Sequence, residues 1–285
     1  MNEFTIERIV DPAIYQPTAE GFYETDLVLN LLPLYVSKRA RAGNEPSEGL
    51  IVKDDKGEIA LCAFRALPFH YLVSTGSAGA ARHLGTYLTD KDCPGITGPD
   101  DVMQPMVKAW QEKSGKTAAH DMTATFYLLS RDDFQPFKRA SGELRLATKE
   151  DLEALIPLMQ TAYEEMKMPM EEREDDVVRA TLSYAIAVGS QLVWDDNGIK
   201  ATLRGIAHKP TMRYINVATH PDFRGKGYAT SLVGSVATGL FNTGFETLML
   251  QADDANPISN RMYVKLGFKP HAKTSAYTFP GAETN

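Results

Sequence analysis

The chain has 285 residues, 43% of them hydrophobic and 24% charged, which is enough for two ordinary globular domains. Its net charge of −7 argues against nucleic acid as the main partner, since a phosphate backbone requires a basic face. Without a signal peptide or an apolar run long enough to span a bilayer, we expect a cytoplasmic protein with no membrane partner. Cys62, Cys93 and the six histidines lack metal-ligand spacing, which predicts reduced thiols and no metal.

The first half of the chain has the pattern of an α/β domain. An apolar helix containing Pro33 opens at Asp26-Leu27, and a strand over Leu50-Ile51-Val52 runs into a turn that ends at Gly57. Two further elements are expected there: a helix with the apolar stripe Val102, Met106, Val107 and Trp110, and a strand over residues 125–129.

The second half gives a more complete series of the same kind. Thr148 and Asp151 predict a capped helix start, a second helix covers about 176–188, and Asn197-Gly198 predicts a hairpin turn. The other expected elements are strands near 144–146, 192–194, 200–207, 212–218, 248–252 and 274–279, a helix after residue 228 and a helix around Tyr263.

The two halves resemble each other weakly. Asp26-Leu27 before Pro33 parallels Asp151-Leu152 before Pro157, and residues 50–57 parallel 192–198. We therefore predict two related domains, over residues 1–138 and 142–285, separated by a polar linker near 132–142. The alternative is coincidence among the common parts of α/β proteins.

The loop between the strand ending near Ala218 and the next helix has the composition of an anion site. Its residues are Arg224, Gly225, Lys226, Gly227, Tyr228, Ala229 and Thr230. A helix start offers free N–H groups and the positive end of the helix dipole, and glycines allow a phosphate to approach the backbone closely. The loop matches neither a dinucleotide fingerprint nor a P-loop, and a solvated basic turn is the alternative.

A second motif follows the strand over 248–252. Together the two motifs resemble the GNAT superfamily of acyl-CoA-dependent N-acetyltransferases over about residues 142–280. The coenzyme A signature Q/R-x-x-G-x-G/A is matched by Arg224, Gly227 and Ala229. The second signature, N-x-x-S/A-x-x-x-Y-x-x-x-G-F, is matched by Asn256, Ser259, Tyr263, Gly267 and Phe268. The implied fold is α/β, a mixed sheet with flanking helices, in tandem GNAT-like domains of which the second is intact.

The resemblance implies transfer of an acetyl group from acetyl-CoA, as cosubstrate, to a primary amine. The amides of residues 225–230, with Arg224 and Lys226, would hold the pyrophosphate, and a bulged strand would present the backbone of Val217, Ala218 and Thr219 to the pantetheine arm and thioester. Tyr263 would act as the general acid, since a phenol stays protonated at neutral pH. The alternative is that Tyr263 only packs between its helix and the sheet.

The roles of two asparagines and of the general base stay open. Asn256 either bonds the pantetheine arm or only caps the helix that opens with Pro257, and Asn260 is a similar candidate. The position where some relatives carry a basic glutamate holds Arg213, which cannot serve. The histidines His208 and His220, a water chain and a neutral amine are all open as alternatives.

The acceptor is expected to be a small-molecule amine. The acidic, methionine-containing segment 163–176 falls where the family commonly forms the acceptor wall, and its alternative is a solvated charge run with methionines in the core.

In the first half, the helix opening at Gly98-Pro99-Asp100-Asp101 would repel a pyrophosphate, which predicts a degenerate copy that forms structure or a substrate wall. Other readings of the whole chain are a non-catalytic coenzyme A-binding or sensing module and an acyltransferase with another acceptor or a longer acyl chain. Either a monomer or a homodimer is compatible with the sequence.

Overall fold

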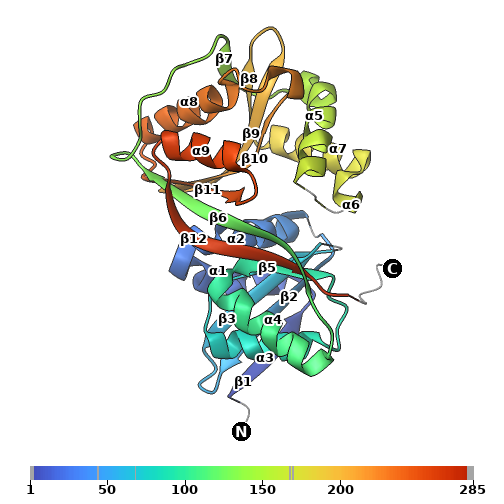
Figure 1. Cartoon of the computed structure of the whole chain (residues 1–285). Coiled ribbons are helices and arrows are strands. Elements are labelled where there is room, and N and C mark those ends of the chain that lie inside the picture. Colours follow the sequence, from blue (N-terminus) through green and yellow to red (C-terminus); the bar gives the residue numbers. More distant parts are fainter. Residues whose placement is uncertain (1–2, 44, 68, 167, 169, 281–285) are drawn as a thin grey trace. The chain divides into compact units, whose positions relative to one another are not determined.

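A computed structural model of the chain describes residues 3–280 except 44, 68, 167 and 169. These residues form two compact units (Figure 1). The first unit holds residues 3–126, 253–255 and 271–280, and the second holds 127–252 and 256–270. The predicted linker over 132–142 therefore lies inside the second unit.

The first unit is a mixed sheet with helices packed against it. Its strand order is β1-β2-β3-β4-β5-β12-β6, and β6 belongs to this unit through Phe126. The elements are β1 (Phe4–Ile9), α1 (Pro12–Tyr23), η1 (Glu24–Asp26), α2 (Leu27–Gly43), β2 (Ser47–Asp54), β3 (Ile59–Ala66), β4 (Tyr71–Val73), α3 (Ala78–Leu88), β5 (Gly95–Pro99), α4 (Asp100–Ser114), β6 (Ala119–Ser130) and β12 (Lys269–Thr278).

The second unit repeats this plan with the strand order β6-β11-β10-β9-β8-β7, and β6 belongs to it from Tyr127. Its other elements are β7 (Glu143–Leu146), η2 (Lys149–Asp151), α5 (Leu152–Glu165), α6 (Met170–Arg173), α7 (Asp175–Ala187), β8 (Gln191–Asp195), β9 (Ile199–His208), β10 (Thr211–Thr219), η3 (Pro221–Phe223), α8 (Tyr228–Asn242), β11 (Thr247–Asp253) and α9 (Pro257–Lys265).

The pairing pattern confirms that the two units are related. In the first unit β1 to β4 pair antiparallel in series and β4 pairs parallel with β5. In the second unit β7 to β10 pair antiparallel in series and β10 pairs parallel with β11. A helix forms each parallel crossover, α3 in the first unit and α8 in the second. The α/β fold with a repeated arrangement is thus present as predicted.

The repeat aligns differently from the prediction, however. Asp26-Leu27 opens α2, the second helix after β1, whereas Asp151-Leu152 opens the first helix after β7. The prediction missed α1, which starts at Asp11-Pro12 with Asp11 accepting a hydrogen bond from the amide of Ala13 at 2.8 Å. The helices with Pro33 and Pro157 seemed equivalent because both are apolar, whereas α1 has Pro17 and Gly21 in its interior, which weakens its helix signal.

Each unit has helices packed against its sheet (Figure 1), with two clusters of buried apolar side chains. In the second unit, α8 and α9 pack over one cluster that includes Trp194, Leu232 and Phe268, and α5 and α7 pack over another that includes Leu155 and Leu182. The first unit has two clusters of the same kind, one under α3 and α4 and one under α1 and α2. The two sides of the second sheet are therefore filled, and the strand ends remain as places for a ligand.

Local sequence signals in the second half are confirmed. Thr148 and Asp151 form a capping box before α5, and Asn197 and Gly198 both take positive φ angles, 55° and 106°, in the β8–β9 turn. The last strand begins at Lys269, five residues before the predicted start at 274, because it leaves α9 immediately after the turn at Gly267.

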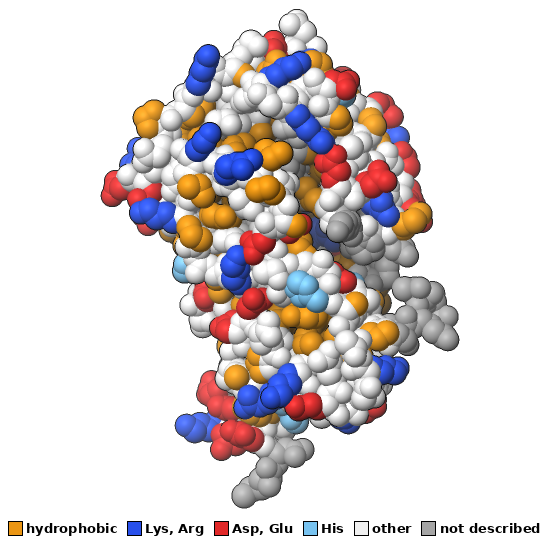
Figure 2. Space-filling view, viewed as in Figure 1, with side chains coloured by type: hydrophobic (Ala, Val, Ile, Leu, Met, Phe, Trp, Pro, Cys, Tyr) orange, Lys and Arg blue, Asp and Glu red, His pale blue; other side chains and the backbone are white. Residues whose placement is uncertain are grey.

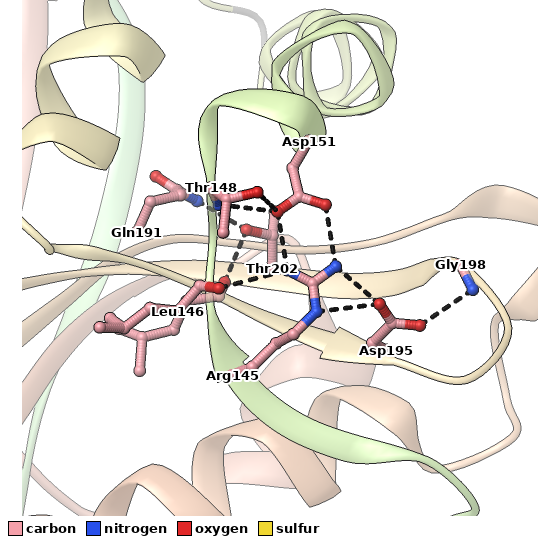
Figure 3. A network of polar contacts seen from close by, with 9 residues as sticks. Arg145, Leu146, Thr148, Asp151, Gln191, Asp195, Gly198 and Thr202 are labelled. Atoms are coloured by element: carbon pink, nitrogen blue, oxygen red, sulfur yellow. Dashed lines mark hydrogen bonds and ion pairs between the residues drawn. The ribbon is translucent and has the colours of Figure 1, made fainter.

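A charged network fixes the start of the second unit (Figure 3). The guanidinium of Arg145 on β7 donates to both carboxylate oxygens of Asp151 at 2.7 and 2.8 Å, and to Asp195 on β8 at 2.6 and 2.9 Å. The hydrogen bond from Arg145 lowers the pKa of Asp151 to about 2, although partial burial opposes the shift. The side chain of Asp151 is only 12% exposed, so solvent screens this pair weakly.

We expect this network to make the protein sensitive to acid. The pKa of Asp151 is lower in the folded state than in the unfolded state, where it is near 4. The carboxylate therefore stabilises the fold above pH 4, and this stabilisation is lost as the pH falls toward about 2. That contribution to the free energy of unfolding is ~2 kcal/mol, and Asp151→Asn should remove it at pH 7. The variant should then lose less stability than the wild type as the pH falls from 4 toward 2. Urea unfolding at pH 7, 4 and 2.5 measures it. The control Arg179→Met breaks only exposed ion pairs, with Glu153 and Asp175, and should change stability by less than about 1 kcal/mol.

Candidate functional site

The turn that leads from β10 into α8 has the backbone geometry expected of an anion site. Gly225 and Gly227 adopt left-handed φ angles of 74° and 83°, and Gly227 is the N-cap of α8. A helix start has four amides without intrahelical partners, and Gly227 has no side chain that could cap them. A Cβ atom added at either glycine would meet no other atom within 4 Å. The turn is therefore open on its outer side.

A cavity of about 490 Å³ lies at this turn, inside the second unit. Gly225, Lys226, Gly227 and Thr230 form one part of its lining. Lys265 and Leu266 at the end of α9 form another, and residues 136–140 form the rest. Lys and Arg side chains lie among hydrophobic ones over the part of the space-filling view where Figure 1 shows α8 and α9 (Figure 2).

The charge of the cavity lining is strongly positive for a chain of net charge −7. Four cationic side chains line it, and no residue of the described lining is acidic. The cations are Lys138, Arg139, Lys226 and Lys265. The prediction included only Lys226, because the other three are brought to the turn by tertiary packing. The sequence signal that could have indicated a cationic wall was the pair Lys138-Arg139, which follows Phe134 and Phe137.

Arg224 is outside this lining and makes its own contacts. Its guanidinium donates to Glu165 on α5 at 2.9 Å and to the carbonyl of Thr219 at 3.3 Å. The side chains of Arg224 and Glu165 are 47% and 52% exposed, so their ion pair contributes little stability and an anionic ligand could compete for the arginine.

The strand before the turn carries the expected bulge. The β9–β10 register shifts between Ile215 and Ala218, and Asn216 there has a φ angle of 54°. The amide nitrogen of the Asn216 side chain donates to the hydroxyl of Tyr163 on α5 at 2.9 Å, which holds the bulge in place. The paired residues of β10 and β11 end at Tyr214 and Leu250, although both strands continue. The backbone of Val217, Ala218 and Thr219 thus lies beyond the parallel pairing.

Tyr263 lies in the apolar cluster beneath α8 and α9. It is 5% exposed, and the centre of its ring lies 5.7 Å from the ring centre of Phe268 and 6.4 Å from that of Tyr127. Burial raises the pKa of its phenol, which therefore stays protonated at neutral pH. Val217 from the bulge packs against the same cluster. This environment places the phenol on the side of the sheet that carries α8 and α9.

The acetyltransferase (GNAT) family model matches residues 152–268, the part of the chain that holds the turn, the bulge and Tyr263. Residues 152–268 are a GNAT domain. The fold of the whole chain is also found in solved structures. A GCN5-related N-acetyltransferase from Sphaerobacter thermophilus has a TM-score of 0.64 at 15% identity, covering 97% of this chain and 95% of that one.

Two more solved structures share the fold along the whole chain. A tandem GNAT protein from the clavulanic acid biosynthesis pathway has a TM-score of 0.60 at 14% identity, with 96% and 98% of the two chains covered. An acetyltransferase of the GNAT family from Colwellia psychrerythraea has a TM-score of 0.61 at 10% identity, with 96% and 99% covered. At these identities the likeness concerns the fold, and it includes the first unit.

Other predicted residues of the GNAT domain have structural partners. Asn256 caps α9, and its side-chain oxygen accepts from the amide of Ser259 at 3.1 Å, as the capping alternative expected. The amide of Asn260 continues that first turn by donating to the carbonyl of Asn256 at 3.2 Å. The hydroxyl of Tyr228 donates to Asp196 in the β8–β9 turn at 2.7 Å, so the backbone of Tyr228, rather than its side chain, is the ligand candidate.

Arg213, which cannot act as a base, and His220, a candidate for that role, both have structural contacts. Arg213 is buried and donates to Gln251 at 2.9 Å, and burial lowers its pKa to about 10, so it remains a cation at neutral pH. His220 accepts from the amide of Asp222 through its Nδ1 at 3.3 Å and packs against Phe223. Among the described residues, no group of His, Cys, Asp and Glu has an arrangement that could hold a metal ion. The helices of the described part of the chain also include none with the length and apolar character of a membrane span.

The segment proposed as an acceptor wall is described in part. Residues 167 and 169 lie outside the described residues. Met166 and Met170 are exposed, by 43% and 71%, whereas Met168 packs against the core under α5 and α7. Exposed methionines are compatible with an adaptable apolar surface, and one of the three contributes to the core.

The first unit has a helix at the place of α8, and it is α3 rather than α4. The prediction compared the turn with the start of α4 at Gly98-Pro99-Asp100-Asp101, but α4 follows β5 and corresponds to α9. At the start of α3, the Ser77 hydroxyl accepts from the amide of Ala80 at 3.1 Å, and the Asn30 side chain accepts from the amide of Thr75 at 2.9 Å. Residues 74–79 include no Lys or Arg. The chain's own side chains use the amides that an anion would need.

Proposed function

We propose that the chain transfers the acetyl group of acetyl-CoA to the primary amine of a small molecule. The GNAT fold supports acyl-CoA-dependent acetyl transfer in general. The observation that supports binding of the cosubstrate here is the open glycine turn at the start of α8, which faces a cavity lined by four cations. This arrangement fits the diphosphate of coenzyme A in charge and in backbone access.

In this proposal each part of the site has one task. Acetyl-CoA supplies an activated acyl group, and the amine nitrogen forms a bond to the acyl carbon while the bond to sulfur breaks. The amides at residues 225–230 and Lys226 hold the diphosphate, and Arg224 adds charge next to them. The backbone of the bulge at Val217 to Thr219 lies along the arm, and the Val217 amide donates to the thioester oxygen as negative charge develops there.

Two protons move in the reaction. The amine passes one to water, and Tyr263 provides one to the departing sulfur and then regains a proton from water. Because burial raises the pKa of Tyr263 above that of a thiol, near 8.5, its proton passes as the carbon–sulfur bond breaks, when the charge on sulfur attracts it most. Asn260 lies one turn before Tyr263 on α9, and Asn256 is the N-cap of the same helix; both are proposed as polar contacts of the arm.

The substitution Gly227→Asp tests the anion site. It places a carboxylate at the N-cap, where its charge repels a diphosphate and lowers the affinity. The left-handed φ of 83° adds strain of ~1–2 kcal/mol, which the control below also carries. We expect acetyl-CoA binding to weaken by a factor of about 30 or more, or ~2 kcal/mol, by calorimetry. Gly189→Asp is the matched control, since Gly189 also has a left-handed φ, 65°, and open space around it.

Turnover is tested by mixing the protein, acetyl-CoA and a panel of small amines while free thiol is measured. Thiol release that depends on an amine supports the enzyme. Tight binding of acetyl-CoA without release from any amine identifies a coenzyme A-binding module instead. If neither coenzyme A nor acetyl-CoA binds to the wild-type chain, the proposed function is wrong.

A further inference from the structure

The cavity at the α8 turn has a wall that comes from a separate part of the chain. We call residues 133–141 the strap. The amide of Gln135 donates to the carbonyl of Leu266 at 3.1 Å, and the amide of Ala140 donates to the hydroxyl of Ser231 on α8 at 2.7 Å. The strap is thus tied to the end of α9 at one point and to the first turn of α8 at the other.

Close packing fixes the middle of the strap. The ring of Phe137 lies so near Gly234 on α8 that a Cβ atom on that glycine would be 2.6 Å from it. The rings of Phe134 and Phe137 have centroids 6.0 Å apart, and Phe134 also packs against Phe241. Phe137 is followed directly by Lys138 and Arg139, so its position determines that both cations line the cavity.

Arg139 is held by a second aromatic contact. Its guanidinium carbon lies 5.0 Å from the centre of the Trp194 ring, and the Trp194 indole donates to the carbonyl of Ser141 at 2.7 Å. A guanidinium above a ring keeps its N–H groups in its own plane, where phosphate oxygens can reach them. The strap therefore presents two cations from fixed backbone positions.

The number of cations exceeds what a diphosphate alone requires. A diphosphate diester carries two negative charges, which the amides of α8 and Lys226 can match. Lys138, Arg139 and Lys265 remain, and they come from the strap and the end of α9. A phosphomonoester adds about −1.5 to −2 at neutral pH, which corresponds to this second group of cations.

We propose that Lys138, Arg139 and Lys265 bind a phosphomonoester on the nucleotide, so that the site selects coenzyme A over its 3′-dephospho form. The strap is a specificity element of the cosubstrate site, and its residues act on binding rather than on chemistry. The inference rests on the proposed function, because it concerns the same cavity.

The test compares two ligands by calorimetry at low salt. Wild-type protein should bind 3′-dephospho-CoA about tenfold or more weakly than coenzyme A, since charge-assisted contacts to the 3′-phosphate are lost. The double variant Lys138→Gln/Arg139→Gln should bind coenzyme A about tenfold more weakly while its affinity for 3′-dephospho-CoA changes by less than about threefold. The two ligands would then bind almost equally.

Two controls separate this role from general charge. Lys108→Gln/Lys149→Gln removes the same charge from residues outside the cavity lining and should preserve the discrimination. Lys226→Gln should weaken both ligands by similar factors. The inference is wrong if the wild type binds the two ligands with equal affinity, or if the double variant still prefers coenzyme A. Neither result contradicts the proposed function. Failure of both ligands to bind overturns the proposed function and this inference with it.

Discussion

Replacing Tyr263 by phenylalanine is expected to slow acetyl transfer by a factor of about 10² to 10⁴, the usual contribution of a general acid. The substitution removes only the hydroxyl from a ring that packs between Tyr127 and Phe268, so the cluster keeps its apolar contacts. Binding of acetyl-CoA should change by less than about threefold, because the proposed diphosphate contacts lie at the start of α8. Amine-dependent thiol release and calorimetry measure the two effects.

The matched control is Tyr127→Phe, which removes a hydroxyl from the neighbouring ring of the same cluster. It should leave the transfer rate within about threefold of wild type, because the proposal gives Tyr127 no proton to move. The raised pKa of Tyr263 adds a further expectation, that its phenol causes no inflection in the rate between pH 7 and its ordinary value near 10. A Tyr263→Phe enzyme with wild-type turnover would show that the ring serves packing alone.

Replacing Gly267 by alanine is expected to be the most destabilising single methyl addition in the GNAT domain. Gly267 has a φ angle of 98°, and a Cβ atom would lie 1.9 Å from the carbonyl oxygen of Asp133. Left-handed strain and this backbone clash act together, so we expect a loss of about 3 kcal/mol or more in the free energy of unfolding. Denaturant unfolding measures the change.

Gly244→Ala isolates the effect of the clash. Gly244 has a similar φ angle of 86°, but nothing lies within 4 Å of its Cβ position, so strain alone should cost ~1–2 kcal/mol. Asp133 begins the strap, so Gly267→Ala should also weaken coenzyme A binding if the fold survives. Equal losses for the two variants would mean that the close approach to Asp133 has no energetic importance.

Much of the GNAT domain could be predicted because its signals are local. A capping box at Thr148 and Asp151, a hairpin turn at Asn197-Gly198 and the glycines of the α8 turn each depend on residues a few positions apart. The β10 bulge was implied by the family resemblance and not by a local pattern, and the register shift between Ile215 and Ala218 confirms it. The first unit was harder, because α1 contains Pro17 and α3 contains Gly79 and Gly85, which are unfavourable inside a helix, and β4 has only three residues.

The cavity shows the limit of such reasoning. Residues 132–142 are polar and contain Pro136, which in a sequence is typical of a linker. The structure makes most of this segment a wall of the site, because Phe137 packs against Gly234 and Ala140 bonds to Ser231. Lys265 joins it from the end of α9, about 125 positions further along the chain. No local pattern connects these residues.

The sequence by itself determined the family of residues 152–268, the α/β class, the presence of a repeat and the position of the glycine turn before α8. Each depends on residue types at short, fixed spacing, where backbone preferences and helix-end chemistry act directly. The tertiary structure decided which helix of the first unit corresponds to α8, that Asn30 and Ser77 occupy the amides there, and which distant cations surround the turn. Those outcomes depend on contacts between segments far apart in the chain, which form only when the sheet and its helices have packed.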